Sequence, residues 1–150
     1  INVFYSGTVA AAAEGAFFGI PSVAVSAEHA GELGFEEPAR LARKIIEQLL
    51  QWGLAGGQLV SINIPAPGPG RPRGVRVVRV STQTIEDRFE RQTDPQGRPI
   101  FWLTGDFAGT GEQDTDLSAL REGFITVSPL RFDLTHYEML AQMQQVPWTI

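Results

Sequence analysis

The chain has 150 residues, of which 43% are hydrophobic and 19% charged, and its formal net charge is -5. This composition is typical of one folded globular domain, and the negative charge argues against general affinity for nucleic-acid duplexes or anionic membranes. The absence of cysteine excludes disulfides, thiolate nucleophiles and Cys-ligated zinc. No apolar run reaches the roughly 18 residues that a membrane span needs, and no signal-peptide pattern occurs, so we expect a cytoplasmic protein.

The first part of the chain alternates helix and strand patterns. Residues 6–8 precede an alanine-rich run, which is typical of a capped helix start, and Gly19 predicts the end of that helix. Residues 22–26, apolar throughout, predict a buried strand, residues 38–52 a second helix, and residues 59–64 a second strand. The second helix carries an apolar stripe that we expect to face the core: Leu41, Ile45, Leu49 and Trp52.

The second part of the chain adds a hairpin and two helices. Residues 66–74 are rich in Pro and Gly and predict a loop, and the valines that follow predict a strand. Two strand-like arms around a turn sequence predict a long β-hairpin over residues 85–103. Thr115 is expected to cap a short helix, which is followed by a strand at 124–128 and a final helix at 133–145. This order of elements predicts an α/β domain with a hairpin added to it.

The segment Ser6-Gly7-Thr8 is the clearest candidate for chemistry. A helix amino terminus presents unpaired N–H groups and the positive end of the helix dipole, glycine lets an anion approach the backbone, and the two hydroxyls add donors. A phosphate group would fit such a site. The same residues are also typical of a helix cap that binds nothing, and the residue pattern alone favours the cap.

A series of sequence blocks, in a fixed order along nearly the whole chain, is more specific than any single motif: Tyr5-Ser6-Gly7-Thr8-Val9 with the run to Gly15, Gly19 to Ser26, Asn63-Ile64-Pro65, Gly74 to Arg79, Thr93 to Leu103, Thr115-Asp116, Glu122 to Leu130 and Asp133-Leu134-Thr135. The series resembles the SurE family, stationary-phase survival proteins that act as 5′- and 3′-nucleotidases and broad acid phosphatases. The resemblance implies metal-dependent hydrolysis of nucleoside monophosphates to nucleoside and phosphate.

The resemblance also implies a fold and an assembly. We expect part of a three-layer αβα, Rossmann-like SurE fold, with a projecting β-hairpin and a carboxyl-terminal helix. In this single domain the core elements span about 1–80 and 115–130, the hairpin extension about 84–104 and the terminal helix about 133–145. A homodimer or homotetramer, formed through the hairpin and the terminal helix, is expected.

By the same resemblance, Ser6, Gly7 and Thr8 are expected to bind the phosphate of the substrate. The family's Asn-Asp-Asp segment, which binds the divalent metal, has no match in the chain, and neither have its further Ser and Asn. We therefore expect a carboxyl-terminal portion whose metal ligands (for Mg²⁺, Mn²⁺ or a similar ion) lie upstream of Ile1. No residue is assigned a catalytic role, and the isolated chain is expected to be inactive.

Two other functions stay open at this point. One is an inactive fragment or oligomerisation module without catalysis, which the missing metal ligands favour. The other is an ordinary nucleotide-binding α/β domain of another enzyme. Sequencing the coding region upstream of Ile1 would distinguish the first alternative from a nucleotidase. A phosphate-release assay on the full-length protein would distinguish the second.

Several side chains have plainer interpretations than ligand binding. His29 is expected in a solvated loop, with a role in a substrate lid as the alternative, and His136 in a surface or intersubunit contact at the start of the last helix. An acidic stretch lacks the spacing of a calcium loop and is expected to be solvated: Asp106, Glu112, Asp114 and Asp116. The hairpin arginines are expected in an exposed arm: Arg88, Arg91 and Arg98. Trp102 is a candidate for an oligomer interface, and Trp148 either packs on a partner or frays.

Overall fold

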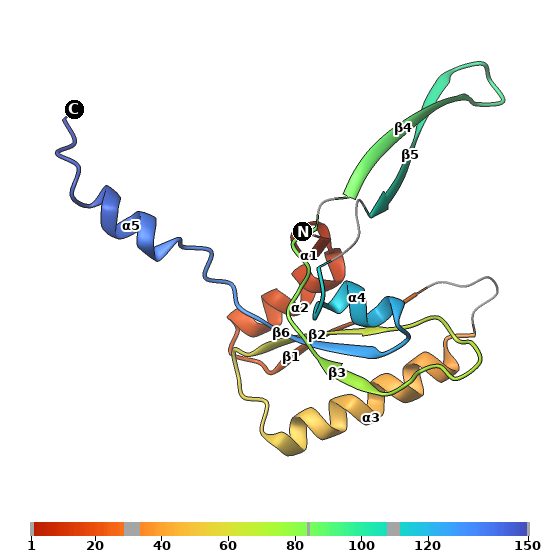
Figure 1. Ribbon diagram of the computed structural model, residues 1–150, viewed down its shortest axis with the longest axis horizontal. Coiled ribbons are helices and arrows are strands. Elements are labelled where there is room, and N and C mark those ends of the chain that lie inside the picture. The colour runs from red at the N-terminus through yellow and green to blue at the C-terminus, as the bar shows by residue number, and fades with distance from the viewer. Residues whose placement is uncertain (1, 29–33, 84, 108–111, 150) are drawn as a thin grey trace.

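The computed structural model describes residues 2–28, 34–83, 85–107 and 112–149 (Figure 1). Its elements in chain order are α1 (Asn2–Tyr5), α2 (Gly7–Phe17), β1 (Ser22–Ala27), α3 (Glu36–Trp52), β2 (Leu59–Ile64), β3 (Val75–Val77), β4 (Ile85–Thr93), β5 (Pro99–Phe107), α4 (Asp116–Arg121), β6 (Ile125–Leu130) and α5 (Tyr137–Met143). The predicted α/β class is confirmed.

Four strands form the central sheet in the order β1-β2-β6-β3, and β4 and β5 form a separate two-stranded sheet. β1 and β2 are parallel, whereas β6 runs antiparallel to β2 and parallel to β3. The carboxyl ends of β1 and β2 therefore lie at the same edge of the sheet. In open α/β sheets this is the edge at which ligands bind.

Helices cover both faces of the central sheet, with α3 on one face and α2 and α4 on the other (Figure 1). Side chains alternate along each strand, so β2 sends Val60, Ile62 and Ile64 into the core under α3 and Leu59 into the core under α2. The core under α2 is lined by small residues of that helix, such as Ala13. The three-layer arrangement that the sequence predicted is present.

The predicted apolar stripe of α3 is correct except at its end. Ile45 is buried and Leu41 and Leu49 are half-buried against the sheet, but Trp52 is 75% exposed, so its assignment to the core was wrong. Gly53 ends α3 in the left-handed conformation, and the N–H of Leu54 donates to the carbonyl of Leu49 at 3.0 Å. This turn places Leu54 in the core in place of the tryptophan.

Two glycines allow the layers to approach closely. A Cβ on Gly15 of α2 would lie 2.7 Å from the hydroxyl of Ser22, and one on Gly56 would lie 2.1 Å from the carbonyl oxygen of Gly19. Because the second contact is with backbone, no side-chain movement would relieve it. Gly15 thus lets α2 lie close to the start of β1, and Gly56 lets the turn before β2 lie close to the residues that follow α2.

The hairpin and the carboxyl-terminal segment both project from the body of the molecule (Figure 1). β4 and β5 pair from Ile85↔Phe107 to Thr93↔Pro99, so the second arm is longer than predicted. Arg98 donates to the Asp94 carboxylate at 2.7 Å, which closes the turn between the arms. None of the described helices is long and apolar enough to cross a membrane.

The last helix is shorter than predicted, Tyr137–Met143 instead of 133–145. The Asp133 carboxylate accepts a hydrogen bond from the N–H of Thr135, and the Nδ1 atom of His136 caps the helix by accepting from the N–H of Met139. These local bonds hold the segment before Tyr137 outside the helix. A hydrogen bond from the Tyr137 hydroxyl, with a further one from Thr135, lowers the pKa of Asp133 to about 2.

Candidate functional site

The amino terminus of α2 is built as its sequence predicts. Ser6 is the N-cap, and its Oγ accepts a hydrogen bond from the N–H of Val9 at 3.2 Å. Among the described residues, the N–H groups of Gly7 and Thr8 have no backbone acceptor. A Cβ added to Gly7 would meet no atom within 4 Å, so the space beside the helix terminus is open. An anion has free access to these donors.

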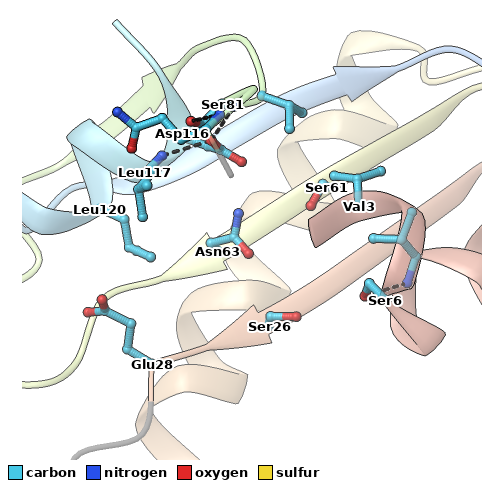
Figure 2. A pocket seen from close by; sticks show the side chains of 13 residues that line it. Val3, Ser6, Ser26, Glu28, Ser61, Asn63, Ser81, Asp116, Leu117 and Leu120 are labelled. Carbon is cyan, nitrogen blue, oxygen red and sulfur yellow. Dashed lines mark hydrogen bonds between the residues drawn. The ribbon is translucent and has the colours of Figure 1, made fainter. Parts of the chain in front are cut away.

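A pocket of about 310 Å³ lies between this helix terminus, the sheet and α4 (Figure 2). The pocket is lined by Val3, Ser6, Val9, Ser26, Glu28, Ser61, Asn63, Val80, Ser81, Gln83, Asp116, Leu117 and Leu120. Its volume falls in the roughly 300–1,000 Å³ range of small-ligand sites. The site joins the carboxyl ends of β1 and β2 to the start of α2.

The floor of the pocket is polar because the strands alternate. Ser26 of β1 and Ser61 and Asn63 of β2 point away from α3 toward the pocket, as Figure 2 shows. The Nδ2 group of Asn63 donates to the Thr126 hydroxyl of β6 at 3.2 Å. Because apolar residues cover the other face, this face of the sheet is the one equipped for hydrogen bonding to a ligand.

Two carboxylates hold the wall of the pocket beside α4. Asp116 accepts from the N–H of Ser81 at 2.7 Å and from the N–H of Leu117 at 2.8 Å. Glu112 accepts from the hydroxyl of Thr82 at 2.6 Å, from its N–H at 3.1 Å and from the Ser81 hydroxyl at 3.2 Å. These hydrogen bonds, those from Thr82 first, lower the pKa of Glu112. The segment that enters the hairpin is thereby fixed to the start of α4.

Of the three predicted phosphate-binding residues, Ser6 lines the pocket, while Gly7 and Thr8 are exposed on the same helix terminus and do not line it. The cap and the anion site, which were alternatives in the sequence, are compatible here. The Ser6 oxygen accepts the capping bond, and its hydroxyl hydrogen is still available for donation.

The other candidates lie apart from this site, except for Asp116 and for Glu112, which bonds to the wall of the pocket. Asp116 lines the pocket and follows Thr115, which is the predicted N-cap of α4. His29 and the side chain of Asp106 lie outside the described residues, and His136 is exposed in the carboxyl-terminal segment. The remaining predicted surface residues are exposed: Arg88, Arg91, Arg98, Trp102, Asp114 and Trp148.

Sequence reasoning missed several polar residues of the pocket lining, namely Ser26, Glu28, Ser61, Ser81 and Gln83. A signal was present, since serines and asparagine alternate with apolar residues in both parallel strands. Residues 22–26 were interpreted as apolar throughout, which was wrong. Ser22 and Ala24 face α2, while Val23 and Val25 pack against the core under α3.

The family model described as "Survival protein SurE" matches residues 1–87. The chain belongs to the SurE family. It is 44% identical over 141 residues to the 5'-nucleotidase SurE 1 of Thermus thermophilus, covering 93% of this chain and 55% of that protein. It is 36% identical over 145 residues to the 5'-nucleotidase SurE of Symbiobacterium thermophilum, covering 96% and 57%.

The fold agrees with a solved SurE structure. The SurE protein of Aquifex aeolicus superposes with a TM-score of 0.77 at 33% identity, covering 95% of this chain and 58% of that one. The SurE fold expected from the sequence blocks is therefore confirmed. The chain spans little more than half the length of the SurE relatives it matches.

The described residues do not fit the divalent metal that the SurE resemblance implies. Within the described ranges, no three His, Asp or Glu side chains lie close enough together to hold a metal ion. Glu28 and Asp116 are the acidic residues of the pocket lining. The residues that line the pocket can therefore donate hydrogen bonds to a ligand and accept them from it.

Proposed function

We propose that the protein is a metal-dependent phosphomonoester hydrolase that converts nucleoside monophosphates to nucleoside and phosphate. Membership of the SurE family and the activity by which its relatives are named support the reaction class. The observation that carries the proposal is the open amino terminus of α2, where Gly7 and Thr8 present N–H groups without a backbone acceptor among the described residues, at the edge of a pocket.

In this proposal the described residues bind the substrate. In the hydrolysis, the oxygen of water bonds to phosphorus, the ester P–O bond breaks, and the leaving oxygen takes up a proton. The N–H groups of Gly7 and Thr8 and the hydroxyls of Ser6 and Thr8 would hold the non-bridging oxygens. Donors fixed at a helix terminus stabilise the negative charge that develops on those oxygens.

The proposal also requires a divalent ion, Mg²⁺, Mn²⁺ or a similar ion, and residues other than the described ones must bind it. When bound, such an ion polarises a phosphoryl oxygen and lowers the pKa of water. We place its ligands upstream of Ile1, as the sequence blocks predict. The 150 residues alone would then bind phosphate and turn over substrate negligibly.

A homodimer or homotetramer is the second part of the proposal. The hairpin exposes Phe89, Phe101 and Trp102, which lie 56–67% accessible on an arm away from the body. The terminal segment exposes Leu134 and Met139 among other apolar residues. Exposed aromatic and methionine side chains of this kind are enriched at protein interfaces. The same surfaces favour the alternative function, an oligomerisation module without catalysis.

Phosphate release separates these functions. The 150-residue chain, and the chain together with all residues that its gene encodes upstream of Ile1, are incubated with AMP and Mg²⁺ or Mn²⁺. We expect metal-dependent release from the second sample and almost none from the first. No release from either sample, together with a stable oligomer in light scattering, would favour the module. Robust release from the first sample would show that the placement of the metal ligands is wrong.

A further inference from the structure

The charges in the pocket differ from those a phosphate site requires. Glu28, at the end of β1, and Asp116, at the start of α4, are both part of the lining, and none of the described lining residues is Lys, Arg or His. Carboxylates repel a phosphate and accept hydrogen bonds from hydroxyl and amino groups. The pocket is therefore suited to a neutral group rich in donors.

Unused acceptors strengthen this interpretation. The N–H of Ala66 donates to Oε2 of Glu28. The N–H groups of Ser81 and Leu117 both donate to Oδ1 of Asp116. Within the described residues, the second oxygen of each carboxylate has no hydrogen-bond partner. Both remaining oxygens are available to a ligand.

Two uncharged side chains of the same lining make no side-chain hydrogen bond to the described residues, and one of them, Gln83, has a buried oxygen atom. Ser61 is only 6% exposed, points into the pocket and makes no side-chain hydrogen bond to the described residues (Figure 2). The Oε1 atom of Gln83 is buried and likewise has no partner there. Leaving the Gln83 oxygen unpaired costs free energy that a hydrogen-bonding ligand would recover, and the Ser61 hydroxyl is open to the same ligand.

The lining also offers apolar surface for a flat ring. Val3 and Val9 lie on the α2 side, and Leu117 and Leu120 lie on α4, so aliphatic side chains flank the polar floor from two sides. Small-ligand sites commonly combine mostly apolar walls with a few placed polar groups. A purine or pyrimidine base meets this combination, because it has apolar faces and a polar edge.

We propose that the pocket is the nucleoside subsite, in which Glu28 and Asp116 accept hydrogen bonds from the ribose hydroxyls or base amino group while the phosphate lies at the amino terminus of α2. This inference rests on the proposed phosphatase function and adds the residues that select a nucleotide over a small phosphomonoester. Ser61 and Gln83 complete the polar contacts of that subsite.

The test compares substrates and variants in the protein with all of its encoded residues. We measure kcat/KM for AMP, for 2',3'-dideoxy-AMP and for p-nitrophenyl phosphate with the unaltered protein and with Glu28→Gln and Asp116→Asn. Both variants keep an amide oxygen for the structural hydrogen bonds. The matched control is Glu47→Gln, because Glu47 lies on α3, where it pairs with Arg43 at 2.8 Å, on the opposite side of the sheet.

We expect the ratio of kcat/KM for AMP to that for p-nitrophenyl phosphate to fall about tenfold in each variant, since a bond to a charged acceptor is lost. The control should keep the ratio. The unaltered protein should prefer AMP over its dideoxy analogue, a comparison that needs no folded variant. Phosphate release with unchanged ratios and no preference for the diol would overturn the subsite and leave the phosphatase function intact. No release from any substrate would overturn both.

Discussion

Replacing Gly7 with alanine separates the stability of α2 from its proposed role in binding phosphate. Gly7 is the first residue of the helix, is not among the residues with positive φ, and a Cβ there meets no atom within 4 Å. At such a position Gly→Ala stabilises a protein by about 0.4–1 kcal/mol, chiefly by restricting the unfolded chain. For a domain of this size that corresponds to a rise in Tm of roughly 1–4 °C.

The same methyl group stands beside the N–H groups that we expect to contact the phosphate. It would hold the anion away from hydrogen bonds that are worth about 1.5–3 kcal/mol each when one partner is charged. Losing one of these bonds lowers kcat/KM roughly tenfold to a hundredfold. Gly7→Ala should therefore melt at a higher temperature and turn over phosphomonoesters more slowly.

The assay pairs a thermal melt with kcat/KM for p-nitrophenyl phosphate in the protein with all of its encoded residues. Gly34→Ala is the matched control, because a Cβ at Gly34 also meets nothing within 4 Å and this residue lies outside the pocket lining. The control should leave kcat/KM unchanged. A raised Tm with unchanged kcat/KM in Gly7→Ala would refute the role of this helix terminus in phosphate binding. A lowered Tm would refute the description of its backbone.

Individual contacts support four further predictions. Ser6→Asp keeps a good N-cap and so keeps the Tm within about 1 °C, but its negative charge should weaken phosphate binding, measured by titration calorimetry. Ile62→Ala, at a fully buried core position, should cost about 2–5 kcal/mol in denaturant unfolding. Gly56→Ala should lower the Tm, because its Cβ would meet the carbonyl of Gly19 at 2.1 Å. Glu112→Gln should make hydrogen exchange at Ser81 and Thr82 less sensitive to acid.

The sign of the last effect follows from the lowered pKa of Glu112, which hydrogen bonds from Thr82 hold below its ordinary value of 4.5. Its contribution to stability is present above that ordinary value and is lost as pH falls through the lowered one. Glu138→Gln, in the exposed terminal helix, serves as control. Equal acid sensitivity of the unaltered protein and Glu112→Gln would contradict the prediction.

Each of the other three predictions, for Ser6→Asp, Ile62→Ala and Gly56→Ala, has a result that would contradict it. Undiminished phosphate affinity in Ser6→Asp would place the anion elsewhere. A cost for Ile62→Ala below about 1 kcal/mol would mean that the core under α3 is not packed as described. An unchanged Tm in Gly56→Ala would mean that the turn before β2 can move away from Gly19.

Features set by neighbouring residues could be predicted from the sequence. The cap of α2 at Ser6, the left-handed stop at Gly53 and the hairpin turn at Asp94 depend on local hydrogen bonds and backbone freedom, and each lies where the sequence placed it. The SurE fold followed from ordered blocks instead of from these local signals. Trp52 fits the helical period but is exposed, because the period alone does not show what packs against the helix at that position.

The candidate site was predicted only at its helix terminus. Ser61 and Gln83 lie 22 residues apart in the chain and line one pocket only because the fold brings the floor of the sheet and the segment before the hairpin together. Nothing local to either residue indicates this. The carboxyl-terminal helix was predicted too long because side-chain caps at Asp133 and His136 compete with the helix.

The most direct test of the central claim is a titration of the ¹⁵N-labelled 150-residue chain with inorganic phosphate, followed by NMR. If the amino terminus of α2 is the phosphate site, the largest amide shifts will occur at Gly7 and Thr8, whose N–H groups lack backbone acceptors among the described residues. Shifts confined to the hairpin arginines, or absent at these two residues at saturating phosphate, would contradict a phosphate site at this helix terminus.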